Sequence, residues 1–200
     1  MSGSVLVACN HVSALDPPLV GSSLPFQLSF IAKEELFRVP ILGQTIRNLR
    51  AIPIRRGTAD YEALDRAVEL LQEGTSVLMF PEGTRHQPGQ LGKARWGFGY
   101  VASKAKRPIV PVFLRGGRSR KPRFLRSHPL EVWMGEAVAV SQISGRDDRD
   151  TYRRIGQEVM RRIEGLMMRS AGRRPLHGLT LAPQQASDSG TSDSPHTASL

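Results

Sequence analysis

Residues 5–18 have the sequence VLVACNHVSALDPP, and this stretch predicts the unit around which the rest of the chain is built. Its first five residues are apolar and partly β-branched, which is typical of a short buried strand. Pro17 disfavours helical backbone at the preceding residue but suits the first turn of a helix. We therefore expect a strand, a turn, and a helix that starts at Pro17 with Asp16 as its N-cap.

A histidine and a carboxylate, His11 and Asp16, lie five residues apart in this predicted turn. On an unbroken helix, five steps rotate a side chain by roughly 500°, which would leave the two about 140° apart. A turn removes that restriction, because it can fold His11 back onto Asp16. A general base with a group that orients it is a catalytic pair. The alternative is a helix cap beside a turn histidine that faces water.

Strand-like and helix-like segments alternate along the rest of the chain, and 200 residues suffice for one sizeable core. This favours a single α/β domain in which helices flank a mixed central sheet. We expect strands at 5–9, 27–32, 51–54, 76–80, 109–114 and 131–134. We expect helical segments from residue 17, over 33–37, 40–49, 60–73 and 95–105, and beyond residue 150. Residues 1–175 would form the domain, and the polar residues 176–200 a disordered tail.

The charge of the chain predicts an anionic partner. Lys and Arg number 28 against 18 acidic residues, which gives a net charge of +10. A phosphate-bearing substrate, an anionic lipid surface and a nucleic acid all fit this charge. The single cysteine, Cys9, excludes an intrachain disulfide and a cysteine-rich metal site. Because we find neither a signal peptide nor an apolar run of about eighteen residues, we expect a cytosolic location or one on the cytosolic face of a membrane.

Two polar clusters directly follow predicted strands, where ligands bind in open α/β sheets. Residues 80–85 are FPEGTR, in which Arg85 could bind phosphate, Glu82 could accept from a substrate hydroxyl, and Gly83 would let backbone approach closely. The alternative is a turn with a solvated ion pair. Arg55 and Arg56 offer a second phosphate contact, of which only one need point inward; the alternative is again a solvated pair.

Four motifs together resemble a known family. The sequences NHVSALD at 10–16, IPIRRG at 52–57, FPEGTR at 80–85 and IVPV at 109–112 occur in this order. They look like the four blocks of the glycerolipid acyltransferases, specifically of bacterial 1-acylglycerol-3-phosphate acyltransferases. The segment AKEELFRVP at 32–40 is also typical of that family. The resemblance covers 5–116, and four blocks in order are far more specific than any one of them.

The resemblance implies a reaction and a catalytic pair. Members of the family move an acyl group from a thioester of coenzyme A or acyl carrier protein to a hydroxyl of a glycerophospholipid precursor. His11 would deprotonate the acceptor hydroxyl, which attacks the thioester directly, and Asp16 would hold the imidazole in the right tautomer. No catalytic Ser or Cys, metal or bound cofactor is implied.

The resemblance also implies a binding site for the acceptor. Glu82 and Arg85, together with Arg56, would hold its glycerol phosphate head, and positioning of this kind can contribute several kcal/mol. The backbone N–H of Gly83 would face the developing oxyanion. These assignments predict a substrate site at the ends of two strands.

Two departures from the family pattern affect these expectations. The second block usually opens with glycine, and here it has Arg50. Only nine residues precede Asn10, where the family usually carries a membrane segment. Membrane association would then depend on an arginine-rich C-terminal helix and on basic residues of the preceding region, namely Arg115, Arg118, Arg120, Lys121, Arg123 and Arg126. The alternative is that these cations are solvated and that the helix packs on the sheet.

The expected function is acylation of lysophosphatidic acid to phosphatidic acid by a peripheral protein on the cytoplasmic face of a membrane. Acylation of glycerol 3-phosphate or of another lysophospholipid is the alternative within the same enzyme class. A non-catalytic domain that binds anionic lipid or nucleic acid, and an inactive remnant, are the alternatives outside it. We expect no nucleic acid partner, because aromatic residues make up only 6% of the chain and such binding leaves the His11–Asp16 pair unexplained.

Overall fold

Six strands form one mixed sheet in the computed structural model, which describes residues 3–48, 51–54, 61–116, 130–143 and 145–172. The order across the sheet is β3-β2-β4-β1-β5-β6, and only β6 runs antiparallel to its neighbour. This confirms the predicted sheet. The strands are β1 (Leu6–Cys9), β2 (Leu28–Lys33), β3 (Ile52–Ile54), β4 (Ser76–Met79), β5 (Ile109–Arg115) and β6 (Glu131–Met134).

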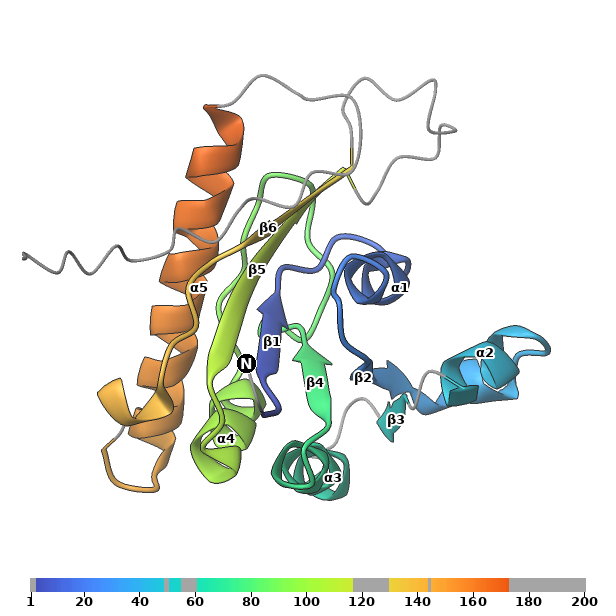
Figure 1. Ribbon diagram of the computed structural model, residues 1–200, viewed down its shortest axis with the longest axis horizontal. Coiled ribbons are helices and arrows are strands. Elements are labelled where there is room, and N and C mark those ends of the chain that lie inside the picture. Colours follow the sequence, from blue (N-terminus) through green and yellow to red (C-terminus); the bar gives the residue numbers. More distant parts are fainter. Residues whose placement is uncertain (1–2, 49–50, 55–60, 117–129, 144, 173–200) are drawn as a thin grey trace, which may run out of the picture.

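Helices cover both faces of this sheet, and Figure 1 shows α1 on the side away from α4 and α5. The helices are α1 (Asp16–Gly21), α2 (Leu42–Asn48), α3 (Tyr61–Gln72), α4 (Trp96–Ala105) and α5 (Arg149–Ala171), with 3-10 turns η1 (Glu34–Arg38) and η3 (Val140–Gln142). Each α-helix and the turn η1 lie close to their predicted ranges, whereas η3 was not predicted. No helix among the described residues is long and apolar enough to cross a membrane.

Strand β1 lies at the centre of the sheet and is fully buried. Leu6 and Ala8 pack in the core beneath α3, α4 and α5, whereas Val7 and Cys9 pack in the second core, beneath α1. Side chains of a strand alternate between its faces, so a strand covered on both sides must be apolar at every position. This explains the unbroken apolar run that predicted the strand.

The predicted apolar stripe of the C-terminal helix packs inward. Ile155, Val159 and Ile163 of α5 are fully buried in the core shared with α4 and β5. Two arginines on the outer side of α5, Arg161 and Arg162, bond to Glu158, and these bonds lower the pKa of that carboxyl to about 2. The structure therefore favours the alternative in which this helix belongs to the core.

Some sequence predictions fall outside the described residues. They concern Arg50, Arg55, Arg56, the tail at 176–200, and the basic residues between 117 and 129. The remaining member of the basic cluster, Arg115, is described. Its guanidinium lies 2.7 Å from the Glu131 carboxylate, so it is paired within the sheet.

Close packing of α4 on α5 yields a prediction for stability. A Cβ atom at Gly99 would overlap the backbone carbonyl oxygen of Tyr152, which cannot move without shifting α5. We expect Gly99→Ala to lower the free energy of unfolding by about 1–3 kcal/mol, measured by denaturant titration. The matched control is Gly165→Ala on α5, where nothing lies within 4 Å and where we expect stabilisation by about 0.5–1 kcal/mol. Equal shifts in the two variants would contradict the packing described.

Candidate active site

The carboxyl ends of β1 and β4 bring two of the sequence motifs together. The strands are adjacent and parallel, with Ala8 opposite Met79. Residues 10–16 follow β1 and residues 80–85 follow β4, so both motifs emerge at the same edge of the sheet. Strand β1 also pairs with β5 on its other side. Ligands of open α/β sheets bind outside the carboxyl ends of the strands, where these two motifs lie.

His11 and Asp16 form a buried hydrogen-bonded pair. The Nδ1 atom of His11 lies 2.8 Å from Oδ2 of Asp16, and their side chains are 11% and 0% exposed. The same carboxylate oxygen accepts from the backbone N–H groups of Val12 and Ser13, each at 2.7 Å. Because an ionised carboxylate only accepts hydrogen bonds, this pattern assigns the hydrogen to Nδ1. The lone pair of Nε2 is then available to take a proton.

The predicted N-cap role of Asp16 is wrong. Helix α1 begins at Asp16 itself, Leu15 is the N-cap residue, and no side chain caps the helix. The Asp16 carboxylate instead turns back toward the loop before it, where the imidazole and two backbone N–H groups are all available as donors. Pro17 lies in the first turn, as predicted.

The position of His11 is fixed from several sides. Its backbone N–H donates to Oε2 of Glu82 at 2.9 Å, and its carbonyl oxygen accepts from the N–H of His86 at 2.8 Å. The ring of Phe80 stacks on the imidazole, with centroids 4.1 Å apart and an angle of 22° between the planes. These contacts restrict both the backbone and the ring plane of His11.

Glu82 is buried, at 2% exposure, and both of its carboxylate oxygens accept hydrogen bonds from backbone. Oε2 accepts from His11 N–H, and Oε1 accepts from Gly92 N–H at 2.6 Å. The carboxylate thus joins the loop after β1 to the loop before α4. This arrangement differs from the predicted contact with a substrate hydroxyl and favours a positioning role for Glu82.

Replacement of Glu82 tests that role. A glutamine at this position keeps one acceptor oxygen but turns an NH₂ group toward a backbone donor, which leaves a buried N–H unsatisfied. We expect Glu82→Gln to lower the free energy of unfolding by about 1–3 kcal/mol, measured by thermal or chemical denaturation. A stable variant with only a raised Michaelis constant for the acceptor would instead support the role predicted from sequence.

Gly83 has a φ of +64°, which favours glycine over other residues. An added Cβ atom would lie 2.6 Å from Cδ of Arg95, so the glycine also makes room for that side chain. The backbone N–H of Gly83 donates to the carbonyl oxygen of Phe80 at 3.0 Å. This hydrogen bond contradicts the predicted use of the same N–H as an oxyanion donor.

Two arginines near this turn, one within it and one at the start of α4, differ in their contacts. Arg85 is exposed and makes no hydrogen bond or ion pair with another described residue. Arg95, which the sequence analysis did not single out, donates from Nε to the Glu82 carbonyl oxygen at 3.2 Å. The Arg95 side chain lies against Gly83, which is twelve positions earlier in the sequence. No local sequence pattern predicts this contact.

Two further residues of β1 and the following loop were also absent from the predicted site. The Asn10 side chain donates from Nδ2 to the Leu114 carbonyl and accepts from Leu114 N–H, at 3.1 and 2.7 Å, and so prolongs the pairing of β1 with β5. Burial raises the pKa of the Cys9 thiol well above its usual value, and the charges of Asp16 and Glu82 raise it further. Such a thiol is a poor nucleophile.

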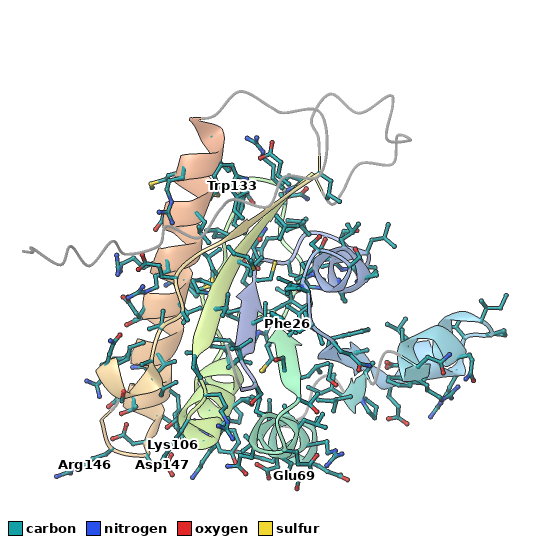
Figure 2. The ribbon with its side chains drawn as sticks, viewed as in Figure 1. Phe26, Glu69, Lys106, Trp133, Arg146 and Asp147 are labelled. Carbon is teal, nitrogen blue, oxygen red and sulfur yellow. The ribbon has the colours of Figure 1, made fainter. Side chains whose placement is uncertain are left out.

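A cavity of about 620 Å³ lies at the other end of the sheet, between the end of α4 and the loop before α5. Lys106 and Asp147 are among the residues that line it. Figure 2 shows both of them, together with Arg146, at the bottom of the view, whereas the arrows of β1 and β4 point upward. The His11 pair and this cavity are therefore at opposite edges of the sheet.

A sequence comparison agrees with this geometry. The sequence model of the Acyltransferase family matches residues 1–115, which is more than half of the chain. The chain belongs to the acyltransferase family. This confirms the resemblance on which the site was predicted, and the matched range includes every residue of the predicted site.

Individual relatives of this acyltransferase domain carry a narrower name. The 1-acyl-sn-glycerol-3-phosphate acyltransferase of Bacillus subtilis is 26% identical over 162 residues, which are 80% of each chain. The chloroplastic enzyme BAT2 of Brassica napus, with the same activity in its name, is 36% identical over 109 residues, or 54% of this chain. The chain spans about a third of the length of such plant relatives, namely 31% of BAT2.

A solved structure shares the fold. The crystal structure of the 1-acyl-sn-glycerophosphate acyltransferase PlsC from Thermotoga maritima matches with a TM-score of 0.67 at 25% identity. The match covers 88% of this chain and 70% of the other. It confirms that the mixed sheet with flanking helices is an acyltransferase fold.

Proposed function

We propose that this chain transfers an acyl group from a thioester to the free hydroxyl of lysophosphatidic acid, which gives phosphatidic acid for phospholipid biosynthesis. The observation that carries the proposal is the His11–Asp16 pair, with Nδ1 held at 2.8 Å and Nε2 left for a substrate proton. The names of its relatives, which specify 1-acyl-sn-glycerol-3-phosphate acyltransferases, support this acceptor.

The proposed reaction has two steps. In the first, Nε2 of His11 takes the proton of the acceptor hydroxyl. The hydroxyl oxygen attacks the thioester carbonyl carbon at the same time, and a tetrahedral intermediate forms. In the second, the C–S bond breaks, and the imidazolium returns the proton to the departing sulfur. Asp16 stabilises the imidazolium between the steps. No protein nucleophile, metal or bound cofactor takes part in this scheme.

The contacts around His11 support a positioning contribution. Three donors converge on one oxygen of Asp16, and Glu82 and Phe80 hold the backbone and ring of the histidine. A base held in one geometry converts binding of the acceptor into a near-attack arrangement, which can supply several kcal/mol of the barrier. The site thus has the preorganisation that direct attack by a substrate hydroxyl requires.

We propose that Arg85, with Arg56, binds the acceptor phosphate. Other described arginines, such as Arg66, Arg115 and Arg162, bond to carboxylates of the protein. The guanidinium of Arg85 has no such partner among the described residues and extends from the turn that contains Glu82. Planar guanidinium groups suit phosphate oxygens.

A kinetic comparison tests this phosphate contact. We expect Arg85→Ala to raise the Michaelis constant for lysophosphatidic acid about ten- to hundredfold, because a hydrogen bond to a charged group contributes about 1.5–3 kcal/mol. The constant for the thioester should stay unchanged. Arg153→Ala is the matched control, since Arg153 is an exposed arginine that bonds to Asp150 on α5. A larger change in the thioester constant would place the donor at Arg85.

The substrates are tested by one panel. Purified protein is mixed with acyl-coenzyme A or acyl carrier protein thioester and with lysophosphatidic acid, glycerol 3-phosphate or lysophosphatidylcholine, and product is identified by mass spectrometry. We expect phosphatidic acid as the main product with at least one of the two donors. A faster reaction with glycerol 3-phosphate would contradict the proposed acceptor.

We further propose that the reaction occurs at the cytoplasmic face of an anionic membrane, where a lipid acceptor resides.

A further inference from the structure

The connection between η1 and α2 exposes apolar side chains to water. Ile41 is 85% exposed and Val39 is 44% exposed, and Pro40 between them is exposed as well. Ile41 is the most exposed of the large hydrophobic residues among those that the structure describes. We refer to residues 39–41 as the apolar tip.

The apolar tip is braced from behind. The N–H of Gly43 donates to the Val39 carbonyl at 2.7 Å, and a Cβ atom at Gly43 would overlap the carbonyl oxygen of Phe37. The same carbonyl accepts from Nη2 of Arg47 at 2.8 Å. Ile46, at 6% exposure, packs α2 into the core beneath α1. The tip is therefore a supported projection whose apolar side chains point outward.

The backbone of Ile41 is strained. Its φ of +65° places a β-branched residue in the left-handed region, where Asn, Asp and Gly are favoured. Such a conformation costs on the order of 1–3 kcal/mol and is concentrated at functional positions. Neither hydration nor backbone preference favours isoleucine at this position, which is consistent with a role for its exposed side chain at an apolar surface.

The tip extends from the edge of the sheet that carries His11. η1 starts directly after β2, and β2 runs parallel to β4, which runs parallel to β1. Leu15, at the start of α1, lies at this edge too and is 58% exposed. In Figure 1, α2 lies beyond β3, at the side of the molecule away from α4 and α5. A flat surface could therefore contact the tip without meeting those helices.

We propose that the apolar tip inserts into the surface of an anionic phospholipid bilayer and holds the edge of the sheet with His11 against it. The inference rests on the proposed function, because a lysophospholipid acceptor is found in a bilayer. Arg38 and Arg47 are exposed beside the tip. Arg38 bonds to Glu34 through one Nη atom, and Arg47 bonds to the Phe37 carbonyl oxygen through one Nη atom, so the remaining N–H groups of both can face lipid phosphates. The chain as a whole carries a net charge of +10. Apolar side chains next to cations are typical of interfacial membrane contacts.

Vesicle flotation tests the contact. Large unilamellar vesicles of phosphatidylcholine with phosphatidylglycerol are mixed with wild type and with Ile41→Asn, which removes the apolar side chain and suits a positive φ, so that the variant folds. We expect partitioning to fall about ten- to hundredfold, the amount that burial of one large aliphatic side chain contributes. Ile41→Leu, which keeps the apolar surface, and Phe26→Asn, which removes an exposed apolar residue before β2, should partition like wild type.

Activity measurements separate this inference from the proposed function. With lysophosphatidic acid in vesicles, the rate of Ile41→Asn should fall in step with partitioning; with a short-chain acceptor dissolved as monomer, it should equal the wild-type rate. Equal partitioning of wild type and Ile41→Asn would overturn the inference, as would equal loss of activity on both acceptors. A wild-type dimer that Ile41→Asn dissociates, with partitioning unchanged, would assign the tip to a second copy and also overturn it. If wild type acylates neither acceptor, the proposed function fails, and flotation still decides the membrane contact.

Discussion

His11→Ala should lower the turnover number for acyl transfer about 10²–10⁴-fold, the usual contribution of a general base. The variant keeps the backbone N–H that donates to Glu82, so the loop after β1 retains that hydrogen bond. It loses Nε2, the only atom in our scheme that takes the proton of the acceptor hydroxyl. The measurement is thiol release from an acyl thioester with lysophosphatidic acid as acceptor, at saturating concentrations of both.

The control for this variant is its folded state. The imidazole is 11% exposed and stacks on Phe80, so its removal also alters packing. Circular dichroism and the unfolding midpoint should therefore be recorded with the kinetics. A folded variant with the wild-type turnover number would exclude His11 as the base.

Asp16→Asn is expected to give the second largest loss, of the same order as His11→Ala. Its amide oxygen can still accept from Val12 and Ser13, so the loop geometry is retained, but the negative charge that stabilises the imidazolium is lost. Asparagine also places an NH₂ group where Asp16 has its other carboxylate oxygen, Oδ1. That oxygen has no hydrogen-bond partner among the described residues, so the substitution breaks no hydrogen bond at this position. The turnover number should fall while the acceptor Michaelis constant changes little.

A double variant shows whether the two residues act as one unit. Because Asp16 acts through His11 in our scheme, His11→Ala/Asp16→Asn should be no slower than His11→Ala alone. A further loss in the double variant would mean that Asp16 contributes to the reaction independently of the histidine. Both rates are measured in the same thiol-release assay.

The strands and helices were predictable because their signals are local. The continuous apolar run that predicted β1 reflects burial on both faces, and the spacing of Ile155, Val159 and Ile163 predicted the inward face of α5. That α5 packs tightly on α4 was not predictable, because it depends on Gly99 meeting the backbone of Tyr152. These residues are far apart in sequence, and neither is unusual in its own segment.

The contact between His11 and Asp16 was predictable, but the contacts of Glu82 and Gly83 were not. The pairing of His11 with Asp16 followed from a short turn, which is a local property. The role of Glu82 depends on backbone N–H groups of His11 and Gly92, which come from two other loops. From sequence alone, a carboxylate directly after a strand suggests a contact with a ligand. Only the structure shows that two backbone N–H groups of the protein already donate to this carboxylate. The N–H of Gly83 is likewise used within its own turn.

The order of thiol release and product formation tests the central claim that the acceptor hydroxyl attacks the thioester directly. Protein, acyl thioester and lysophosphatidic acid are combined in turn, and free thiol, phosphatidic acid and intact protein mass are followed together. We predict one phosphatidic acid for each thiol, no thiol release before the acceptor is added, and no change in protein mass. Stoichiometric thiol release without acceptor, with an acyl adduct on the protein, would contradict the account.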